Sequence, residues 1–389
     1  MNLTLWIHRQ TALTAVALAF LISCEAQPPY GKVVSLDPGI TLVDLTPLSD
    51  GSFLFAGIYH GDEDFQVLAY FAQSDSSFQL KWEKRYRDND IEMGTHLLRL
   101  EDRYLLIGAS SSLDSARTKS RVVLLDNDYR EVFHHTFGQS RMDRLSSGAL
   151  SPGGGVILVG STRRDKGQGI NGWLVQLDDS GSLVWEKTFG VPGIGKGDWL
   201  SDIAPVGRDR YLISGLTFSS GNGQSDGWLQ MVDLDGELLW SQTCGGPGKD
   251  SFADMLILQN GHVLLGGVST DTGGTPMGWL LEVDQEGELI RSHYYPQVSR
   301  VSELCRHPEA GYVLAGIVRQ AETETDVWLA HISESGEILW EQTIGSKRLD
   351  NPGGLVNLQD RIRLTLITNS FEDQGNVWVI DVGADGQLF

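Results

Sequence analysis

The chain has 389 residues, of which 51 are Asp or Glu and 30 are Lys or Arg, so its formal net charge is −21. This balance argues against a nucleic-acid partner, because affinity for nucleic acid comes from neutralising phosphates with Lys and Arg. It also argues against attachment to anionic lipid through bulk charge.

The N-terminal segment has the pattern of an export signal. Arg9 precedes an uncharged apolar run over residues 11–22. That run is too short to span a bilayer, which needs about 20 residues. A charged start before a short apolar core is typical of a cleaved signal peptide. We therefore expect residues 1–23 to be a signal peptide and residues 24–31 to be a short tether.

The apolar run ends in Leu21-Ile22-Ser23-Cys24, which resembles the lipobox of bacterial lipoproteins. The resemblance implies a lipid anchor on Cys24 and a place in the bacterial cell envelope. The next residue is Glu25 and not Asp, which by the same resemblance points to the outer membrane. The alternative is an ordinary signal peptide with an incidental cysteine. Cys244 and Cys305 lie in different repeats, so we expect no disulfide between them.

Internal repetition with a period of about 50 residues dominates the rest of the chain. Three landmarks keep the same register from repeat to repeat. A glycine ends the second strand of each unit at Gly57, Gly108, Gly160, Gly215, Gly267 and Gly316, with Leu366 at the seventh place. A tryptophan leads the third strand at Trp173, Trp228, Trp279, Trp328 and Trp378. An aromatic residue closes the unit at Trp82, Phe133, Trp185, Trp240 and Trp340, with Arg291 in its place once.

Each unit contains four strand candidates, which we name A to D from the centre outward. Alternating apolar residues and Asp/Gly turns favour strands and hairpins over helices. Four strands repeated seven times predict an all-β fold, a seven-bladed β-propeller of four-stranded antiparallel blades over residues 32–389. The last repeat stops at Leu388-Phe389, where strand D should begin. We expect the strand candidate Lys32 to Leu36 to complete that blade and close the ring, which removes two exposed sheet edges.

The repeats resemble those of bacterial exported propeller proteins with Gly…Asp-x-Trp-Leu…Asp-x-x-Gly…Trp motifs, within the quinoprotein-like and Kelch-like superfamily. The match is clear in Asp226-Gly227-Trp228-Leu229, Asp233-Leu234-Asp235-Gly236 and Trp240. Many such proteins are exported or lipid-anchored, so the resemblance implies the fold far more than a function. The docking motif of the quinoprotein-like group is missing, and we expect no cofactor.

No constellation of catalytic or metal-ligating residues is evident. The histidines are scattered, and the Asp-rich turns lack the further ligands that a calcium loop needs. We therefore expect no catalytic, cofactor-binding or metal residues. We expect the tryptophan series to pack between blades, the alternative being a stacking platform for sugars.

Long, polar B–C loops suggest a functional face, because loops on a rigid scaffold carry function. We expect such loops at Ser110–Ser120, Thr162–Gly172, Thr217–Gly227 and Ser269–Gly278, beside an expanded D–A loop at Gly190–Gly197. The candidate ligand face carries a basic crescent of Arg117, Lys119, Arg121, Arg163, Arg164, Lys166, Lys196 and Lys249. Acidic residues lie on its other side at Glu322, Glu324, Asp326, Glu372, Asp373, Asp62, Glu63 and Asp64. The alternative is that these charges only serve solubility.

These observations predict a monomeric, membrane-anchored lipoprotein that acts as a binding or scaffold module. It would recruit an envelope protein or a polysaccharide through the B–C and D–A loops. The alternative function is a hydrolase or lyase acting on polysaccharide, with carboxylates such as Asp198 or Asp250. The absence of a paired acid/base motif favours the binding module.

Overall fold

The computed structural model describes residues 30–34, 36–37, 39–61, 67–87, 89, 91–112, 117–138, 140, 142–163, 169–191, 197–321, 324–345, 349–368 and 376–389. The expected signal peptide and all but the last two residues of the expected tether lie outside these residues. No helix in the described ranges has the length and apolar character needed to cross a membrane.

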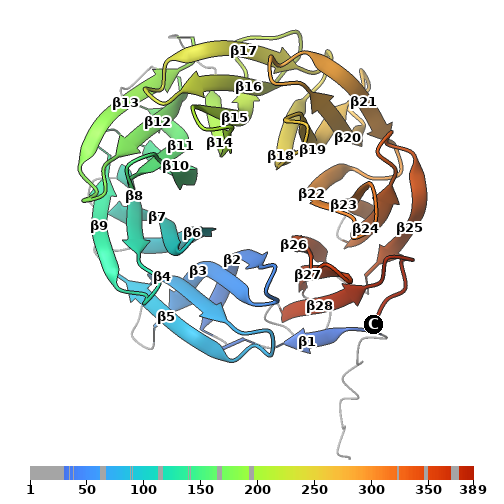
Figure 1. Ribbon diagram of the computed structural model, residues 1–389, viewed down its shortest axis with the longest axis horizontal. Coiled ribbons are helices and arrows are strands. Elements are labelled where there is room, and N and C mark those ends of the chain that lie inside the picture. The colour runs from blue at the N-terminus through green and yellow to red at the C-terminus, as the bar shows by residue number, and fades with distance from the viewer. Residues whose placement is uncertain are drawn as a thin grey trace, which may run out of the picture.

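Within the described residues, 28 strands form seven four-stranded antiparallel blades around a central axis, which confirms the predicted all-β propeller (Figure 1). The strands are β1 (Lys32–Val34), β2 (Ile40–Pro47), β3 (Phe53–His60), β4 (Val67–Ser74), β5 (Leu80–Tyr86), β6 (Ile91–Leu100), β7 (Arg103–Ser112), β8 (Arg117–Leu125), β9 (Glu131–Phe137), β10 (Met142–Leu150), β11 (Val156–Arg163), β12 (Asn171–Leu177), β13 (Leu183–Phe189), β14 (Asp198–Val206), β15 (Arg210–Thr217), β16 (Asp226–Asp233), β17 (Leu238–Cys244), β18 (Asp250–Ile257), β19 (Val263–Thr270), β20 (Pro276–Val283), β21 (Leu289–Tyr295), β22 (Arg300–Arg306), β23 (Tyr312–Ala321), β24 (Glu324–Ile332), β25 (Ile338–Ile344), β26 (Asp350–Asn357), β27 (Ile362–Thr368) and β28 (Asn376–Val382).

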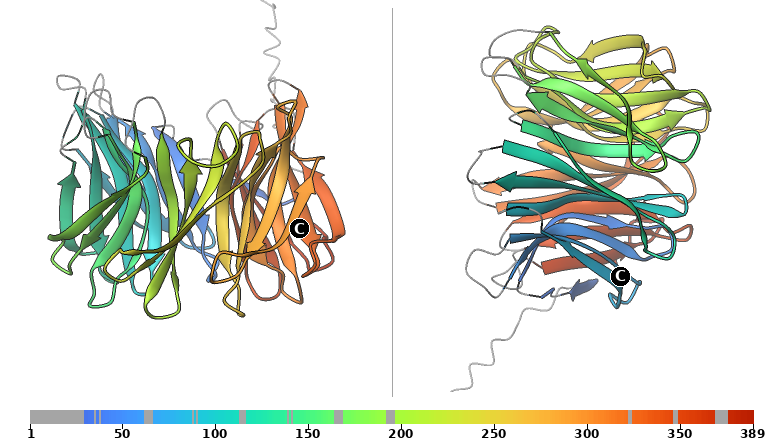
Figure 2. Two further views of the ribbon diagram at one scale, coloured as in Figure 1. Left: turned by 90° about the horizontal axis from the view of Figure 1, so that it is seen from above. Right: turned by 90° about the vertical axis from the view of Figure 1, so that its left-hand side faces the viewer.

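Blades 1 to 6 each take four consecutive strands from β2 to β25, and blade 7 consists of β26, β27, β28 and β1. Strand A of each blade lies next to the axis and strand D lies at the rim (Figure 1). The strands cross the thickness of the ring between two faces (Figure 2). We call the face with the A–B and C–D turns the turn face, and the face with the B–C and D–A connections the loop face.

The repeated glycine is explained by a β-bulge in strand A. Within the described residues every blade has this bulge, for example between Leu145 and Ser147 in blade 3, and the strand-B glycine lies opposite it. The bulge brings a strand-A carbonyl so close that a Cβ on Gly160 would overlap the carbonyl oxygen of Arg144. Only glycine fits such an approach. Blade 7 has Leu366 at this place and has Gly353 and Gly354 in its own strand A.

The tryptophans pack within and between blades, as predicted. Four leading tryptophans pair with the strand-B glycine of their blade, as Trp173 does with Gly160, and Trp378 pairs with Leu366. The series is at most 7% exposed. The closing Trp240 donates its ring N–H to the carbonyl of Gln285 in the next blade at 3.0 Å. Burial on this scale leaves the leading rings unable to serve as a sugar-stacking platform.

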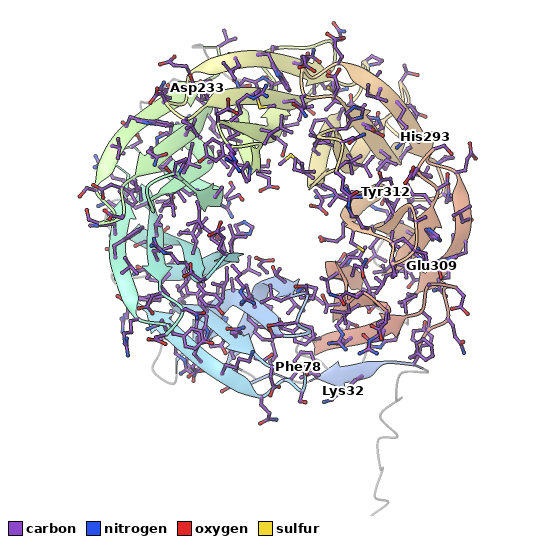
Figure 3. All side chains as sticks on the ribbon, viewed as in Figure 1. Lys32, Phe78, Asp233, His293, Glu309 and Tyr312 are labelled. Atoms are coloured by element: carbon purple, nitrogen blue, oxygen red, sulfur yellow. The ribbon has the colours of Figure 1, made fainter. Side chains whose placement is uncertain are left out.

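The hydrophobic core lies between neighbouring blades. In the described part of the chain, seven buried clusters each join two adjacent blades. One of them contains Cys305, and both Cys244 and Cys305 are free thiols. Side chains of the strands fill the spaces between the sheets (Figure 3). Because each central strand is covered on both faces, strands B and C are almost continuously apolar.

The ring closes through an outer strand shared by the two ends of the chain. Leu388 pairs with Val382 at the start of the strand-D position of blade 7, and Phe389 donates its backbone N–H to the carbonyl of Asp381 at 2.9 Å. Farther along the same edge of β28, β1 takes over, with Lys32 opposite Val379. This confirms the predicted closure by the N-terminal strand, which lies beside β28 in Figure 1.

Candidate functional site

The expected B–C loop of blade 2 is shorter than predicted. Residues 110–120 were expected to form it, but β7 continues to Ser112 and β8 begins at Arg117. The three basic residues assigned to that loop therefore lie on one side of a strand. Arg117 and Lys119 are exposed at the loop face, whereas Arg121 lies deeper in the blade and has no exposed surface.

The assignment of Arg121 to the ligand face is wrong. Arg121 pairs with Gly108, so it occupies the place of the leading tryptophan in blade 2. It donates to the buried Glu92 at 2.9 Å, bonds to His134 and lies over the ring of Tyr86 at 5.2 Å. A buried cation needs such partners, because desolvation of an unpaired charge is costly. Sequence could have shown this, since Arg121 follows Gly108 at the same separation as Trp173 follows Gly160.

The other basic residues in the described ranges lie at the loop face, three of them at the ends of strands. Met142 pairs with Thr118 on one side and with Arg163 on the other, so Arg117 and Lys119 lie about 10 Å from Arg163, two strand spacings away. Arg163 is partly exposed. Lys249 is exposed beside Ser225, between blades 4 and 5. None of these four makes an ion pair with another described residue.

The remaining members of the predicted charge pattern cannot be placed. Arg164, Lys166 and Lys196 lie outside the described residues, as do the acidic positions Asp62, Glu63, Asp64, Glu322, Glu372 and Asp373 and the side chain of Glu324. Asp326 is described and is partly buried. The separation of basic and acidic halves on the loop face stays a prediction.

The two carboxylates suggested for an enzyme are buried at the loop face of blades 4 and 5. Asp198 is 1% exposed and accepts hydrogen bonds from the hydroxyls of Thr217 at 2.6 Å and Ser219 at 2.5 Å. Asp250 has no exposed surface and accepts the backbone N–H of Gly246 at 2.9 Å. Both begin a strand A and fix the connection beside it. Both oxygens of Asp198 accept hydrogen bonds, whereas Oδ1 of Asp250 is buried without a hydrogen-bond partner among the described residues.

A set of inner carboxylates escaped the sequence analysis. Asp44, Asp202, Asp254 and Glu303 each follow the bulge of their strand A, in blades 1, 4, 5 and 6. Each of the four carboxylates is on a different strand, and the four are far apart in the sequence. No local sequence motif therefore identifies them. The repeat register places them at the same level around the axis, where His96 of blade 2 also lies, 3.4 Å from Asp44.

Hydrogen bonds tie these carboxylates to neighbouring strands. Asp202 accepts from the hydroxyl of Ser147 at 2.7 Å, and Asp254 accepts the backbone N–H of Leu304 at 2.7 Å. These bonds join blades 3 and 4 and blades 5 and 6. Burial raises the pKa of Asp254 to about 7, with a further contribution from the charge of Asp202.

Glu303 has the most perturbed environment of this set. Burial raises the pKa of Glu303 well above its usual range, and the charges of Asp254 and Asp44 raise it further, against the opposing effect of Arg300. Perturbed pKa values can mark functional sites, but structural networks perturb them too. In the described residues, no group of three or more His, Cys, Asp or Glu side chains is arranged to hold a metal ion.

The structural neighbours of this chain are β-propeller proteins. The WD40 domain of Neurospora crassa Pan2 is 10% identical, with a TM-score of 0.50 over 88% of this chain and 96% of that one. The β-propeller domain of the Trilobed protease from Pyrococcus furiosus is 9% identical, with a TM-score of 0.52 over 91% and 96%. Pyrococcus horikoshii acylaminoacyl peptidase is 10% identical, with a TM-score of 0.51 over 91% and 53%.

No family model and no curated protein matches the chain. At these identities the likeness to solved structures shows the fold alone. The comparisons therefore support a propeller and leave open the specific family that its repeats resemble.

Proposed function

We propose that this protein is a membrane-anchored binding module that recruits an acidic partner through its loop face. The observation that carries the proposal is the group of Arg117, Lys119 and Arg163, which lie close together at the loop face of blades 2 and 3. They have no ionic partner among the described residues, although the chain has a net charge of −21. A local basic surface on an acidic protein attracts and orients an anionic partner.

The scaffold suits this role. Arg117, Lys119 and Arg163 lie in paired strands, so binding does not have to order their backbone. The partner is an envelope protein with an acidic surface or an anionic polysaccharide. A polysaccharide hydrolase or lyase is less well supported, because Asp198 and Asp250 are both buried and Asp198 already accepts hydrogen bonds from two hydroxyls.

Charge reversal tests the loop-face proposal. We expect the triple variant Arg117→Glu, Lys119→Glu and Arg163→Glu to bind acidic probes at least about tenfold more weakly, because close charge pairs contribute over 1 kcal/mol. Polyglutamate and polygalacturonate are the probes for a protein and a polysaccharide partner, and binding is measured by calorimetry at low salt.

The matched control is the variant Lys81→Glu, Arg130→Glu and Arg361→Glu, which makes the same change in net charge at the turn face. It should bind as the wild type does. Equal weakening in both variants would mean that only total charge matters, and no binding of either probe by the wild type would contradict the proposal.

The anchor is tested separately on Cys24. We expect the variant Cys24→Ser to move from the membrane fraction to the soluble fraction and to lose incorporation of labelled fatty acid. Membrane fractionation of cells that express either form checks this. Retention of Cys24→Ser in the membrane would remove the lipid anchor from the proposal and leave the loop-face binding untouched.

A further inference from the structure

A cavity of about 680 Å³ lies on the turn face, where blades 2, 3 and 4 meet. Its wall is formed by the ends of the inner strands β6, β10 and β14 and by the turns that follow them. This volume is within the range of about 300–1,000 Å³ that is typical of small-molecule sites. The cavity lies on the face opposite to Arg117 and Arg163, so it is separate from the surface proposed above.

Small residues border the cavity in blades 3 and 4. Gly148 in β10 occupies a position that bears a large apolar residue in the other six inner strands, namely Leu45, Leu97, Ile203, Met255, Leu304 and Leu355. Leu105 and Leu158 pack directly against the Gly148 backbone. A Cβ on Gly148 would overlap the side chains of Leu105 and Leu158, so these two leucines fill the place of the absent side chain. Ala149 and Ala204 are further small residues in the wall.

Four arginines from two blades converge on the cavity, which also has Glu101 and Asp102 in its wall. Arg208 is exposed and has no partner among the described residues. The Nε of Arg210 is buried and donates no hydrogen bond, and the carboxylate of Asp209 is 3.6 Å away from it. Arg103 donates one N–H group to the carbonyl of Gly154 at 2.6 Å. The fourth is Arg99, which lies 3.5 Å from Asp50.

These arginines retain free donors for an anion. A guanidinium presents five N–H groups in a planar fork that matches a carboxylate or a phosphate. A buried Nε without an acceptor has a desolvation cost that an anionic ligand would offset. The arginines outnumber the two acidic residues in the wall, in a chain whose other charges are mostly negative.

The rest of the wall is apolar. Leu100, Leu150, Pro205 and Leu234 line it with side chains that are at least partly exposed. Ile203 and Tyr211 also line it but are at most 5% exposed, and the Tyr211 hydroxyl is bonded to the carbonyl of Leu150 at 3.0 Å. Recognition of charge is therefore left to the arginines. A ligand that satisfies both halves of the wall has one anionic group on an apolar body.

We propose that this cavity binds a small amphiphilic anion. Its carboxylate or phosphate is held by Arg208 and Arg210, and its apolar body packs on Leu150 and Pro205. The site is independent of the loop-face surface and gives the molecule a second binding function on the turn face.

Photoaffinity labelling of the full chain tests this proposal. The probe is decanoate with a diazirine on its alkyl chain, and labelled positions are mapped by mass spectrometry. We expect labels on β10 and on the turn between β14 and β15. Unlabelled decanoate or decyl phosphate should compete, and their relative strength decides between carboxylate and phosphate, whereas neutral decanol should compete at least about tenfold less well.

Two variants separate charge from volume. Arg208→Ala with Arg210→Gln should weaken labelling about tenfold or more, and Ala204→Phe should weaken it by filling the cavity without changing charge. Arg130→Ala, an exposed arginine on a turn of the same face, should label as the wild type does. Labelling outside the cavity, equal competition by decanol, or undiminished labelling of the double variant would overturn the proposal.

Discussion

Arg121 and Glu92 form an ion pair without exposed side-chain surface in blade 2. Removing one member of such a pair leaves the other charge buried, at a cost of about 3–5 kcal/mol. We therefore expect Arg121→Ala to lower the free energy of unfolding by that amount in urea titrations. Arg121→Ala combined with Glu92→Gln should recover part of the loss. Arg130→Ala, whose ion pair is exposed, is the control, and a similar small effect of both substitutions would contradict this account of Arg121.

Glu303 gives a prediction about pH. Its pKa is raised in the folded protein by burial and by Asp254 and Asp44, with Arg300 opposing them. The folded state therefore binds the proton more tightly than the unfolded chain, whose Glu has a pKa of about 4.3. The contribution of Glu303 to the free energy of unfolding is fully present below the pKa that Glu303 has in the unfolded chain. It is lost as the pH rises toward the higher pKa that Glu303 has in the folded protein.

The variant Glu303→Gln cannot ionise at this position, so the loss of stability at high pH does not occur. The Glu303 side chain makes no described hydrogen bond that the substitution would remove. We expect the variant to melt at a higher temperature than the wild type near pH 8 and at about the same temperature near pH 4.5. Differential scanning calorimetry at both pH values measures this. The control Glu286→Gln, at an exposed turn, should leave the melting temperature unchanged at both pH values. A Glu303→Gln variant that melts at a lower temperature than the wild type near pH 8 would refute the raised pKa.

The strand-B glycine is tested by adding one methyl group. In Gly160→Ala the new Cβ would overlap the carbonyl oxygen of Arg144, so we expect a loss of about 1–3 kcal/mol of stability. Gly246 has open space around its Cβ position, and Gly246→Ala should stay within about 0.5 kcal/mol of the wild type. Chemical denaturation compares the two, and equal effects would show that the bulge does not require glycine.

Among the elements, the outer strand of blade 7 depends on both chain ends. Trp378 is fully buried, its ring N–H is bonded to the carbonyl of Tyr30 at 3.0 Å, and the Tyr30 ring stacks on it at 5.4 Å. Deleting the chain through residue 34 would expose Trp378 and the edge of β28. We expect a loss of about 2 kcal/mol or more, because burial of a large aromatic side chain contributes about that much.

Partial recovery by an added peptide of residues 30–36 would show that β1 acts as a separable strand. Thermal melts with and without the peptide provide the measurement. A truncated protein as stable as the full chain would mean that β1 does not close the ring.

Sequence predicts elements well wherever a physical constraint repeats. The glycine opposite the bulge and the tryptophan paired with it recur in most blades, so the number of blades and the closure at Leu388-Phe389 followed from spacing. The bulge itself has no residue signature of its own and was not predicted. Nor were the inner carboxylates, because each blade supplies at most one and only the closed ring brings them together.

The candidate surfaces were harder to predict than the fold. Arg121 was assigned to the same loop as Arg117 and Lys119 from charge alone. A run of basic residues has the same sequence pattern whether it lies on a loop or continues into a strand. The cavity on the turn face is lined by residues of three blades, and no local motif marks it. Such a cavity becomes visible only when the blades are placed side by side.

At the scale of the whole molecule, the propeller presents two different faces. The loop face has exposed basic residues at blades 2 and 3, and the turn face has the arginine-lined cavity between blades 2, 3 and 4. The proposed anchor precedes β1, which lies at the rim of blade 7. The chain therefore enters the ring at the rim, and neither the loop face nor the turn face is its point of entry.

The central claim is that the loop face of blades 2 and 3 binds a partner in the envelope. The most direct measurement places a photocrosslinking amino acid at Lys119 and, in a second protein, at Arg130 on the turn face, and crosslinks both in native membranes. We predict one partner captured from Lys119 and not from Arg130, with capture reduced when Arg117 and Arg163 are reversed to Glu. No capture from Lys119, or the same products from both positions, would contradict the claim.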